Sequence, residues 1–407
     1  MAHEHEVDVP EVVKKRLVVT AVALAVLTVV GIVVLRPTGD DRPDIRRLGF
    51  VSDLYGADVV AVEDAACPGT RPEDFLVCSF VTIELKGGPH QGEERTLEIP
   101  IDTTSPDFDE GDEIVVSRTP GAGEQEYQFA DRERRPVLLG LALLFGVTVV
   151  LLGRIRGLAA LGGLVVSVVV LLQFTLPAII DGRSPVLVAI VSAAAIAFLA
   201  LYLAHGFNTM TTVALLGTLA SLALTAVLAA MFVAVSEFSG FATEEALYLQ
   251  VAGGRLDLEG LILAGAVIGA LGAIDDMTVT QASAVWELRA VNPSMTRRAL
   301  YTSGLRIGRD HVASTVNTLL LAYAGAALPL LLLFVLSEQS LGAVANGEAV
   351  AVEIVRTLVG SIGLVSSVPI TTWLAVRLAP GGASEHSEEE SEDVGAGERP
   401  EEEHPAD

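Results

Sequence analysis

One face of a helix predicted over residues 260–289 carries side chains that bind cations or relay protons. Acids and hydroxyls recur there at i, i+4, i+7 and i+11, in the order Asp276, Thr280, Ser283 and Glu287. This spacing puts all four on one side of an α-helix. Carboxylate and hydroxyl oxygens are ligands for hard cations, and acids inside a membrane often mark ion or proton paths. The row therefore predicts a path for a small ion or solute.

The row begins at an acid pair, Asp275 and Asp276, that directly follows an apolar run. A carboxylate at the centre of a membrane helix costs about 2.5 to 3.5 kcal/mol, which favours a functional interpretation. The alternative is that both acids lie at the water boundary and only cap the span. We favour a functional role for Asp276 and a structural one for Asp275.

A second polar face is expected on the next helix. It consists of Arg306, Asp310, Ser314 and Asn317. Arg306 and Asp310 are four residues apart and can pair on a helix, while the remaining oxygens extend the predicted path. The alternative is that such polar groups only hold membrane helices together. The neighbouring His311 is interpreted as an interfacial residue rather than a ligand.

Small residues precede the acid pair at intervals of four: Gly265, Gly269 and Ala273. They leave one helix face almost bare, so a second helix is expected to approach closely there.

Enzyme signatures are absent from the sequence: there is no phosphate-binding glycine loop, no HExxH and no nucleophile elbow. Asp276 and Asp310 facing each other would resemble the carboxylate pair of an intramembrane hydrolase, which is the weakest hypothesis. We expect no enzyme activity and no cofactor, and the sequence does not decide whether a metal binds.

These residues must be positioned by membrane helices, because 51% of the 407 residues are hydrophobic and gather in long runs. The sequence predicts eight transmembrane helices, at residues 17–35, 136–153, 158–180, 186–204, 212–235, 261–276, 312–336 and 354–376. The net charge of −25 is concentrated outside them. Residues 36–135 hold 23 acids against 11 bases, and residues 384–407 hold 11 against one, which together account for −22. So acidic a surface argues against a nucleic-acid partner.

Residues 36–135 alternate short polar and apolar runs separated by turns, which predicts a small all-β domain of OB or SH3-like type inserted between the first two spans. Strands are expected at residues 57–62, 75–85, 93–101 and 113–117. The only cysteines, Cys67 and Cys78, lie in this domain. A disulfide between them and two free thiols are equally open, because spacing alone does not show that their β-carbons meet.

Basic residues predict the orientation, because they gather in cytoplasmic segments. They place a cytoplasmic N-terminus at residues 1–16 and the β-domain outside. The membrane domain then runs over residues 136–377, and residues 378–407 form a disordered acidic cytoplasmic tail.

Residues 272–276, 287–288, 303–310 and 317–323 resemble the YibE/F-like family of bacterial integral membrane proteins, as does His205-Gly206-Phe207-Asn208 followed by Leu216-Gly217-Thr218. The resemblance covers about residues 136–377. It implies a multi-pass protein of the bacterial inner membrane, described as a permease, and it implies no substrate.

Within that resemblance, Asp276 and Glu287 match positions where the family carries an acid. Asp275 and Gln281 stand where apolar residues are expected. The leading hypothesis is a permease for a small ion or solute in the lipid bilayer. The alternative, from a different class, is a membrane scaffold whose β-domain binds an envelope protein.

Overall fold

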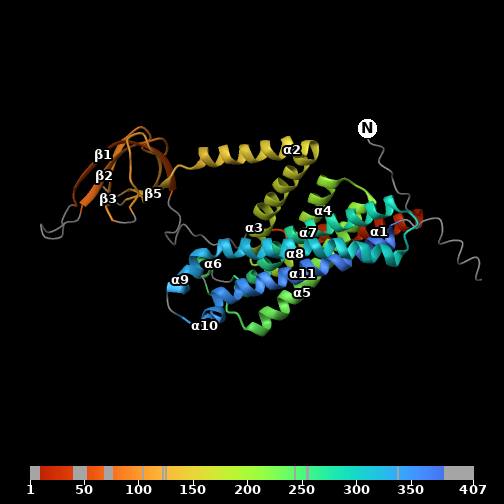
Figure 1. Cartoon of the computed structure of the whole chain (residues 1–407). Coiled ribbons are helices and arrows are strands. Elements are labelled where there is room, and N and C mark those ends of the chain that lie inside the picture. The colour runs from red at the N-terminus through yellow and green to blue at the C-terminus, as the bar shows by residue number, and fades with distance from the viewer. Residues whose placement is uncertain are drawn as a thin grey trace, which may run out of the picture. The chain divides into compact units, whose positions relative to one another are not determined.

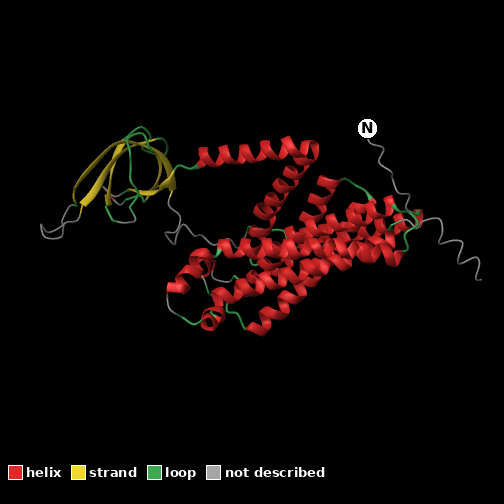
Figure 2. Ribbon diagram, in the orientation of Figure 1, coloured by secondary structure: helices red, strands yellow, loops and turns green. Residues whose placement is uncertain are grey.

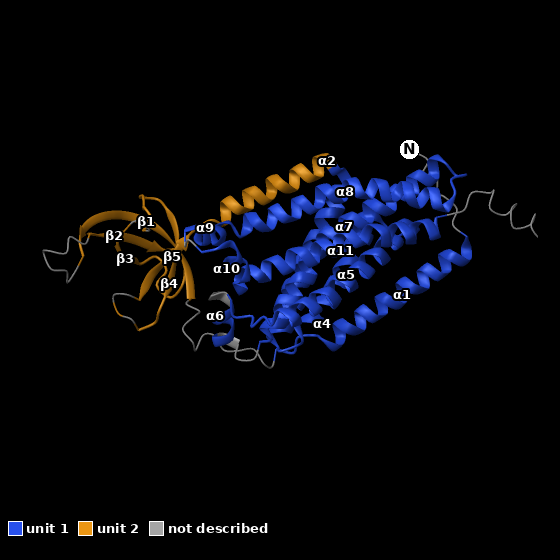
Figure 3. Ribbon diagram, turned by 60° about the horizontal axis from the view of Figure 1, so that its bottom comes forward, with its two compact units in different colours: residues 1–42, 153–407 blue, residues 43–152 orange. Residues whose placement is uncertain are grey.

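The computed structural model describes residues 10–39, 53–67, 77–102, 105–121, 123, 126–242, 244–253, 256–336 and 339–379. It divides into two compact units, one of residues 1–42 with 153–407 and one of residues 43–152 (Figure 3). The first nine residues and most of the predicted acidic tail, residues 380–407, lie outside the described residues.

Unit 43–152 contains a five-stranded antiparallel sheet in the order β3-β2-β1-β4-β5, curved around its own core (Figure 2). The strands are β1 Asp53–Ala66, β2 Val77–Leu85, β3 Glu94–Pro100, β4 Glu113–Arg118 and β5 Tyr127–Arg132. Side chains of β2 alternate between the core and the surface, which buries Val81, Ile83 and Leu85. Four of the strands lie close to their predicted positions, and β5 was not predicted.

Cys67 and Cys78 are joined by a disulfide, with their α-carbons 5.0 Å apart. Cys78 lies near the start of β2 and pairs in register with Ala65 of β1. The bridge therefore ties the end of β1 to the start of β2.

The rest of the described chain is helical (Figure 1). The helices are α1 Glu11–Val34, α2 Arg135–Val170, a π-helical turn η3 Leu171–Thr175, α3 Leu176–Ile180, α4 Pro185–His205, α5 Thr209–Ser236, α6 Glu244–Gly253, α7 Leu258–Val291, α8 Arg297–Ala326, α9 Leu328–Leu336, α10 Leu341–Asn346 and α11 Glu348–Leu378. Among the described residues, six helices are long and apolar enough to cross a bilayer, or seven if the bent pair α8 and α9 is one span. This is compatible with a multi-pass membrane protein.

The span count differs from eight because of residues 135–180. They count as one apolar helical stretch of 46 residues. The connection expected at residues 154–157, between the predicted spans 136–153 and 158–180, is reduced to one non-helical residue, Arg154, with φ 52° and ψ −129°. The predicted span 312–336 is also different, because α8 and α9 meet there at a bend of 65°.

Helices α5 and α11 cross through the same short pattern, Gly-x3-Ser-x3-Thr. Its residues are Gly217, Ser221 and Thr225 in α5, and Gly363, Ser367 and Thr371 in α11. The side chain of Thr371 occupies the space that a β-carbon at Gly217 would need, and Thr225 does the same at Gly363. The glycine of each helix therefore packs against the threonine of the other. The two helices run antiparallel at this point, and the crossing has local two-fold symmetry.

Helix α7 packs against α4, α5, α8 and α11. Its N-terminus is capped by Asp257, whose carboxylate accepts a hydrogen bond of 2.8 Å from the amide of Gly260. The buried residues recur every three or four positions, at Ala264, Val267, Leu271, Ile274, Thr278, Gln281 and Val285. This repeat puts the buried face of α7 on one side and leaves the predicted polar row on another.

Candidate functional site

The predicted polar row of α7 lies on the exposed side of that helix. Asp276, Thr280 and Glu287 are exposed and Ser283 is half-buried. The side chain of Asp276 retains 69% of its accessible surface. The row thus forms a surface of oxygen atoms along α7 rather than part of the core.

One residue of α8 reaches this row. Nε2 of His311 lies 3.7 Å from Oδ2 of Asp276, within ion-pair range but beyond hydrogen-bond length. In the described structure, Nε2 of His311 has no hydrogen-bond partner. An imidazole that faces a carboxylate at this distance can act as its ion-pair partner whenever the ring carries a proton. His311, interpreted from the sequence as interfacial, is therefore the nearest chemical partner of Asp276.

The second predicted face, on α8, is also exposed: this holds for Arg306, Asp310, Ser314 and Asn317. A guanidinium nitrogen of Arg306 lies 3.5 Å from the hydroxyl of Ser303. Among the described residues, no ion pair joins Arg306 to Asp310. The structure therefore links the predicted row of α7 to α8 through His311, which belonged to neither predicted face.

The small residues of α7 accommodate polar side chains. A β-carbon at Gly265 would lie 3.3 Å from Nη2 of Arg356 in α11, and one at Gly269 would lie 2.9 Å from the hydroxyl of Tyr323 in α8. Ala273 is half-buried and packs on the main helical core. The bare backbone of Gly265 and Gly269 therefore makes room for a guanidinium and a phenol.

These contacts continue the polar row toward the other end of α7. Residues 265 and 276 are eleven apart, close to three turns, so they share a face. Arg356 is held by Glu353, with Nη1 and Oε1 2.5 Å apart. The sequence-based prediction missed this pair. A signal was present, because Arg356 lies two residues inside a predicted apolar span and follows Glu353 by three residues, a spacing that allows pairing on a helix.

The buried face of α7 has its own polar centre at Gln281, which is 1% exposed. Its amide donates to the carbonyl of Gly304 in α8 at 2.8 Å and to the hydroxyl of Thr372 in α11 at 2.7 Å. The amide oxygen lies beside Gly308, where a β-carbon would come within 2.7 Å of it. Gln281 thus connects three helices.

Replacing Gln281 with leucine should lower the stability of the bundle by about 1 to 3 kcal/mol, because the buried hydroxyl of Thr372 loses a partner and the branched side chain meets Gly308. The measurement is the apparent Tm of the purified protein in detergent. Gln281→Glu is the matched variant: it keeps the shape but removes the donor, and should also destabilise. A wild-type Tm in both variants would contradict the role given to this amide.

The two acids of the pair face different surroundings. Oδ1 of Asp275 is buried and has no hydrogen-bond partner in the described structure, whereas Asp276 is exposed. Asp275 lies on the side that faces α5, beside Thr278, whose hydroxyl is 2.6 Å from that of Thr218. Thr218 is the tenth residue of the 28 in α5, about 13 Å along that helix. This level is inside the bundle. The sequence-based preference for Asp276 over Asp275 did not anticipate that Asp275 is the less exposed acid, with one buried carboxylate oxygen.

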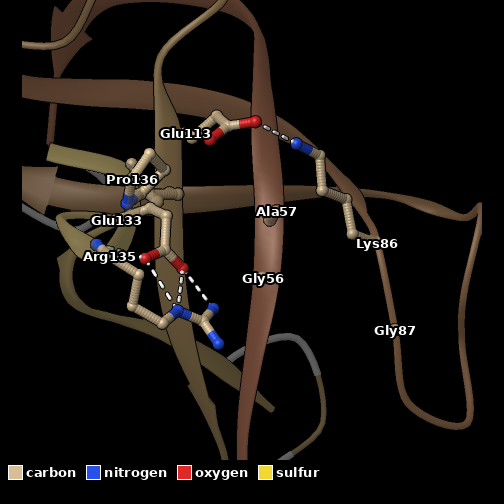
Figure 4. Close-up of a pocket in the computed structure, with 9 residues that line it drawn as sticks. Gly56, Ala57, Lys86, Gly87, Glu113, Glu133, Arg135 and Pro136 are labelled. Atoms are coloured by element: carbon tan, nitrogen blue, oxygen red, sulfur yellow. Dashed lines mark hydrogen bonds and ion pairs between the residues drawn. The ribbon is translucent and has the colours of Figure 1, made fainter. Parts of the chain in front are cut away.

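The β-unit has a separate cavity of about 400 Å³ (Figure 4). Its charged lining residues are paired: Lys86 with Glu113 at 2.6 Å, and Arg135 with Glu133. The guanidinium of Arg135 lowers the pKa of Glu133 to about 2, because it donates hydrogen bonds to the ionised carboxylate. Charges that already neutralise each other leave this cavity without a free recognition group among the residues that line it.

Comparison with known proteins gives one match. Neither curated proteins nor solved structures show a similar chain. A family model described as YibE/F-like protein matches residues 141–381, which is more than half of the chain and includes α7, α8 and α11. The chain therefore belongs to the YibE/F-like family.

Proposed function

We propose that the protein is a permease that moves a small ion or solute along the polar face of α7. The observation that carries this proposal is the contact between Asp276 of α7 and His311 of α8. An acid and an imidazole that face each other between two helices are costly to keep at membrane depth unless they act on an ion or a proton. The acids of the row favour a cation, moved in exchange for protons.

Two further features support the proposal. The face of α7 is lined by polar groups over much of its length, from Arg356 beside Gly265 to Glu287. The antiparallel crossing of α5 and α11 has local two-fold symmetry, and many secondary transporters are built with pseudo-two-fold symmetry around their substrate site.

The proposed topology has eight spans with both termini in the cytoplasm of a bacterial inner membrane. Residues 135–180 would extend about 69 Å as one straight helix, more than twice the bilayer core, so we divide them at Arg154 into two spans. The bent pair α8 and α9 supplies one span. The disulfide supports an extracytoplasmic β-domain of small barrel type, because such bonds persist in oxidising compartments.

Asp276→Asn and His311→Gln should each slow transport by about tenfold or more, the effect expected when one charged partner of the path is lost. The test uses purified protein in vesicles that contain a pH-sensitive dye, with NaCl, KCl or MgCl2 added outside. Wild-type vesicles should release protons in response to at least one of these salts.

Glu259→Gln is the matched control, because it removes an exposed carboxylate from the first turn of the same helix, on a different face. Its transport rate should equal that of the wild type. Transport that survives Asp276→Asn would exclude the α7 face as the path. A wild type that responds to none of the salts would argue against cation–proton exchange.

A further inference from the structure

A second group of oxygen atoms lies between α5 and α7, on the buried side of α7. It consists of the carboxylate of Asp275 and the hydroxyls of Thr218 and Thr278. Both threonines are fully buried, and their hydroxyl oxygens are 2.6 Å apart. The carboxylate of Asp275 lies beside Thr218, and its Oδ1 is buried without a hydrogen-bond partner among the described residues.

The group has more acceptors than donors. Thr278 donates to the carbonyl of Asp275 at 3.0 Å, and Thr218 is within 3.1 Å of the carbonyl of Ala214. Two hydroxyl hydrogens therefore face four acceptors, namely these two carbonyls, the neighbouring hydroxyl oxygen and the carboxylate. Oxygen lone pairs that are left facing one another are stabilised by a positive charge.

No such charge comes from the surrounding protein. In the part of the chain that the structure describes, no Lys, Arg or His lies within ion-pair distance of Asp275. His311 is directed at Asp276 instead. An ionised carboxylate that is buried without a counter-charge is strongly unfavourable, so either a proton or a bound cation must neutralise Asp275.

We propose that Asp275, Thr218 and Thr278 form a binding site for one small monovalent cation, sodium. A single carboxylate neutralises a single positive charge, whereas Ca²⁺ and Mg²⁺ require more oxygen ligands or more acidic ones. The site differs from the Asp276 row in its residues and its burial, and the inference does not depend on transport.

The test measures sodium binding rather than transport. The full chain, purified in detergent, is heated in increasing NaCl, with choline chloride added to hold the ionic strength constant. Because a ligand that binds the folded state raises Tm, Tm should increase with the logarithm of the NaCl concentration once that concentration exceeds Kd, and KCl should have a weaker effect. Retention of radioactive sodium by the purified protein provides the direct measurement.

Three variants decide the assignment. Asp275→Asn should abolish the sodium-specific rise in Tm, and Thr278→Val should shift the onset of that rise to about tenfold higher NaCl. Thr278→Val keeps the side-chain shape and serves if Asp275→Asn does not fold. Asp276→Asn removes the adjacent carboxylate and should leave the response unchanged.

Two results would overturn the proposal. One is a wild type whose Tm depends on NaCl no more than on choline chloride. The other is an equal response in Asp275→Asn and wild type. If Tm instead depends on pH in the wild type, is lost in Asp275→Asn and is insensitive to sodium, then the buried carboxyl carries a proton and the sodium site is wrong.

Discussion

Replacing Gly217 or Gly363 with valine should disrupt the α5–α11 crossing and lower stability by about 3 kcal/mol or more. The reason is steric, because a β-carbon at either glycine would overlap the threonine of the opposite helix, and the interior has no free volume to accept it. The measurement is the apparent Tm in detergent, together with the fraction of protein that remains monodisperse after heating. By the local symmetry, the two variants should be affected to a similar degree.

A double-mutant cycle separates this contact from other effects of valine. In the described structure, the hydroxyl of Thr371 has no hydrogen-bond partner, so Thr371→Ala alone should lose no hydrogen bond. Gly217→Val should be less destabilising in the Thr371→Ala background, with a coupling energy of about 1 kcal/mol or more. Gly140→Val in α2, where a β-carbon has nothing within 4 Å, should leave Tm unchanged. Additive effects would contradict the proposed contact.

Most of the fold could be predicted from the sequence where periodicity is strong. The apolar runs that became α4 and α5 were located to within three residues, and α11 begins six residues before the run predicted for it, because membrane helices need about twenty apolar residues in a row. Four of the five strands were located by their alternation and turns. The single break at Arg154 could not be predicted, since a basic tetrapeptide is typical of both a loop and a kinked helix.

The site was predicted less completely, because the sequence shows which residues share a helix face but not which neighbour that face meets. The row from Asp276 to Glu287 does lie on one face. Its partner His311, and Tyr323 and Arg356 near the glycines, depend on how α8 and α11 pack on α7. Asp275 illustrates the limit: neighbouring acids on a helix point about 100° apart, so one can be buried while the other is exposed, and only packing decides which.

Removing the disulfide should destabilise the β-unit by about 3 kcal/mol. In the chain-entropy account, the bridge closes a loop of about twelve residues, and opening it returns conformational freedom to the unfolded chain. Cys67→Ala with Cys78→Ala in the full chain should therefore make unit 43–152 sensitive to protease at a lower temperature than in the wild type. The helical bundle, which contains no cysteine, should keep its own resistance.

Reduction provides an internal control, because the chain has no other cysteine. Wild-type protein treated with a thiol reductant should become as protease-sensitive as the double variant, and the variant itself should not respond to the reductant. A difference between reduced wild type and variant would assign the loss to the replaced side chains rather than to the bridge. Equal resistance of oxidised wild type and variant would mean that the hydrophobic core formed by β1, β2 and β4 is sufficient without the cross-link. The bridge would then mark the compartment of the β-unit but contribute little to its stability.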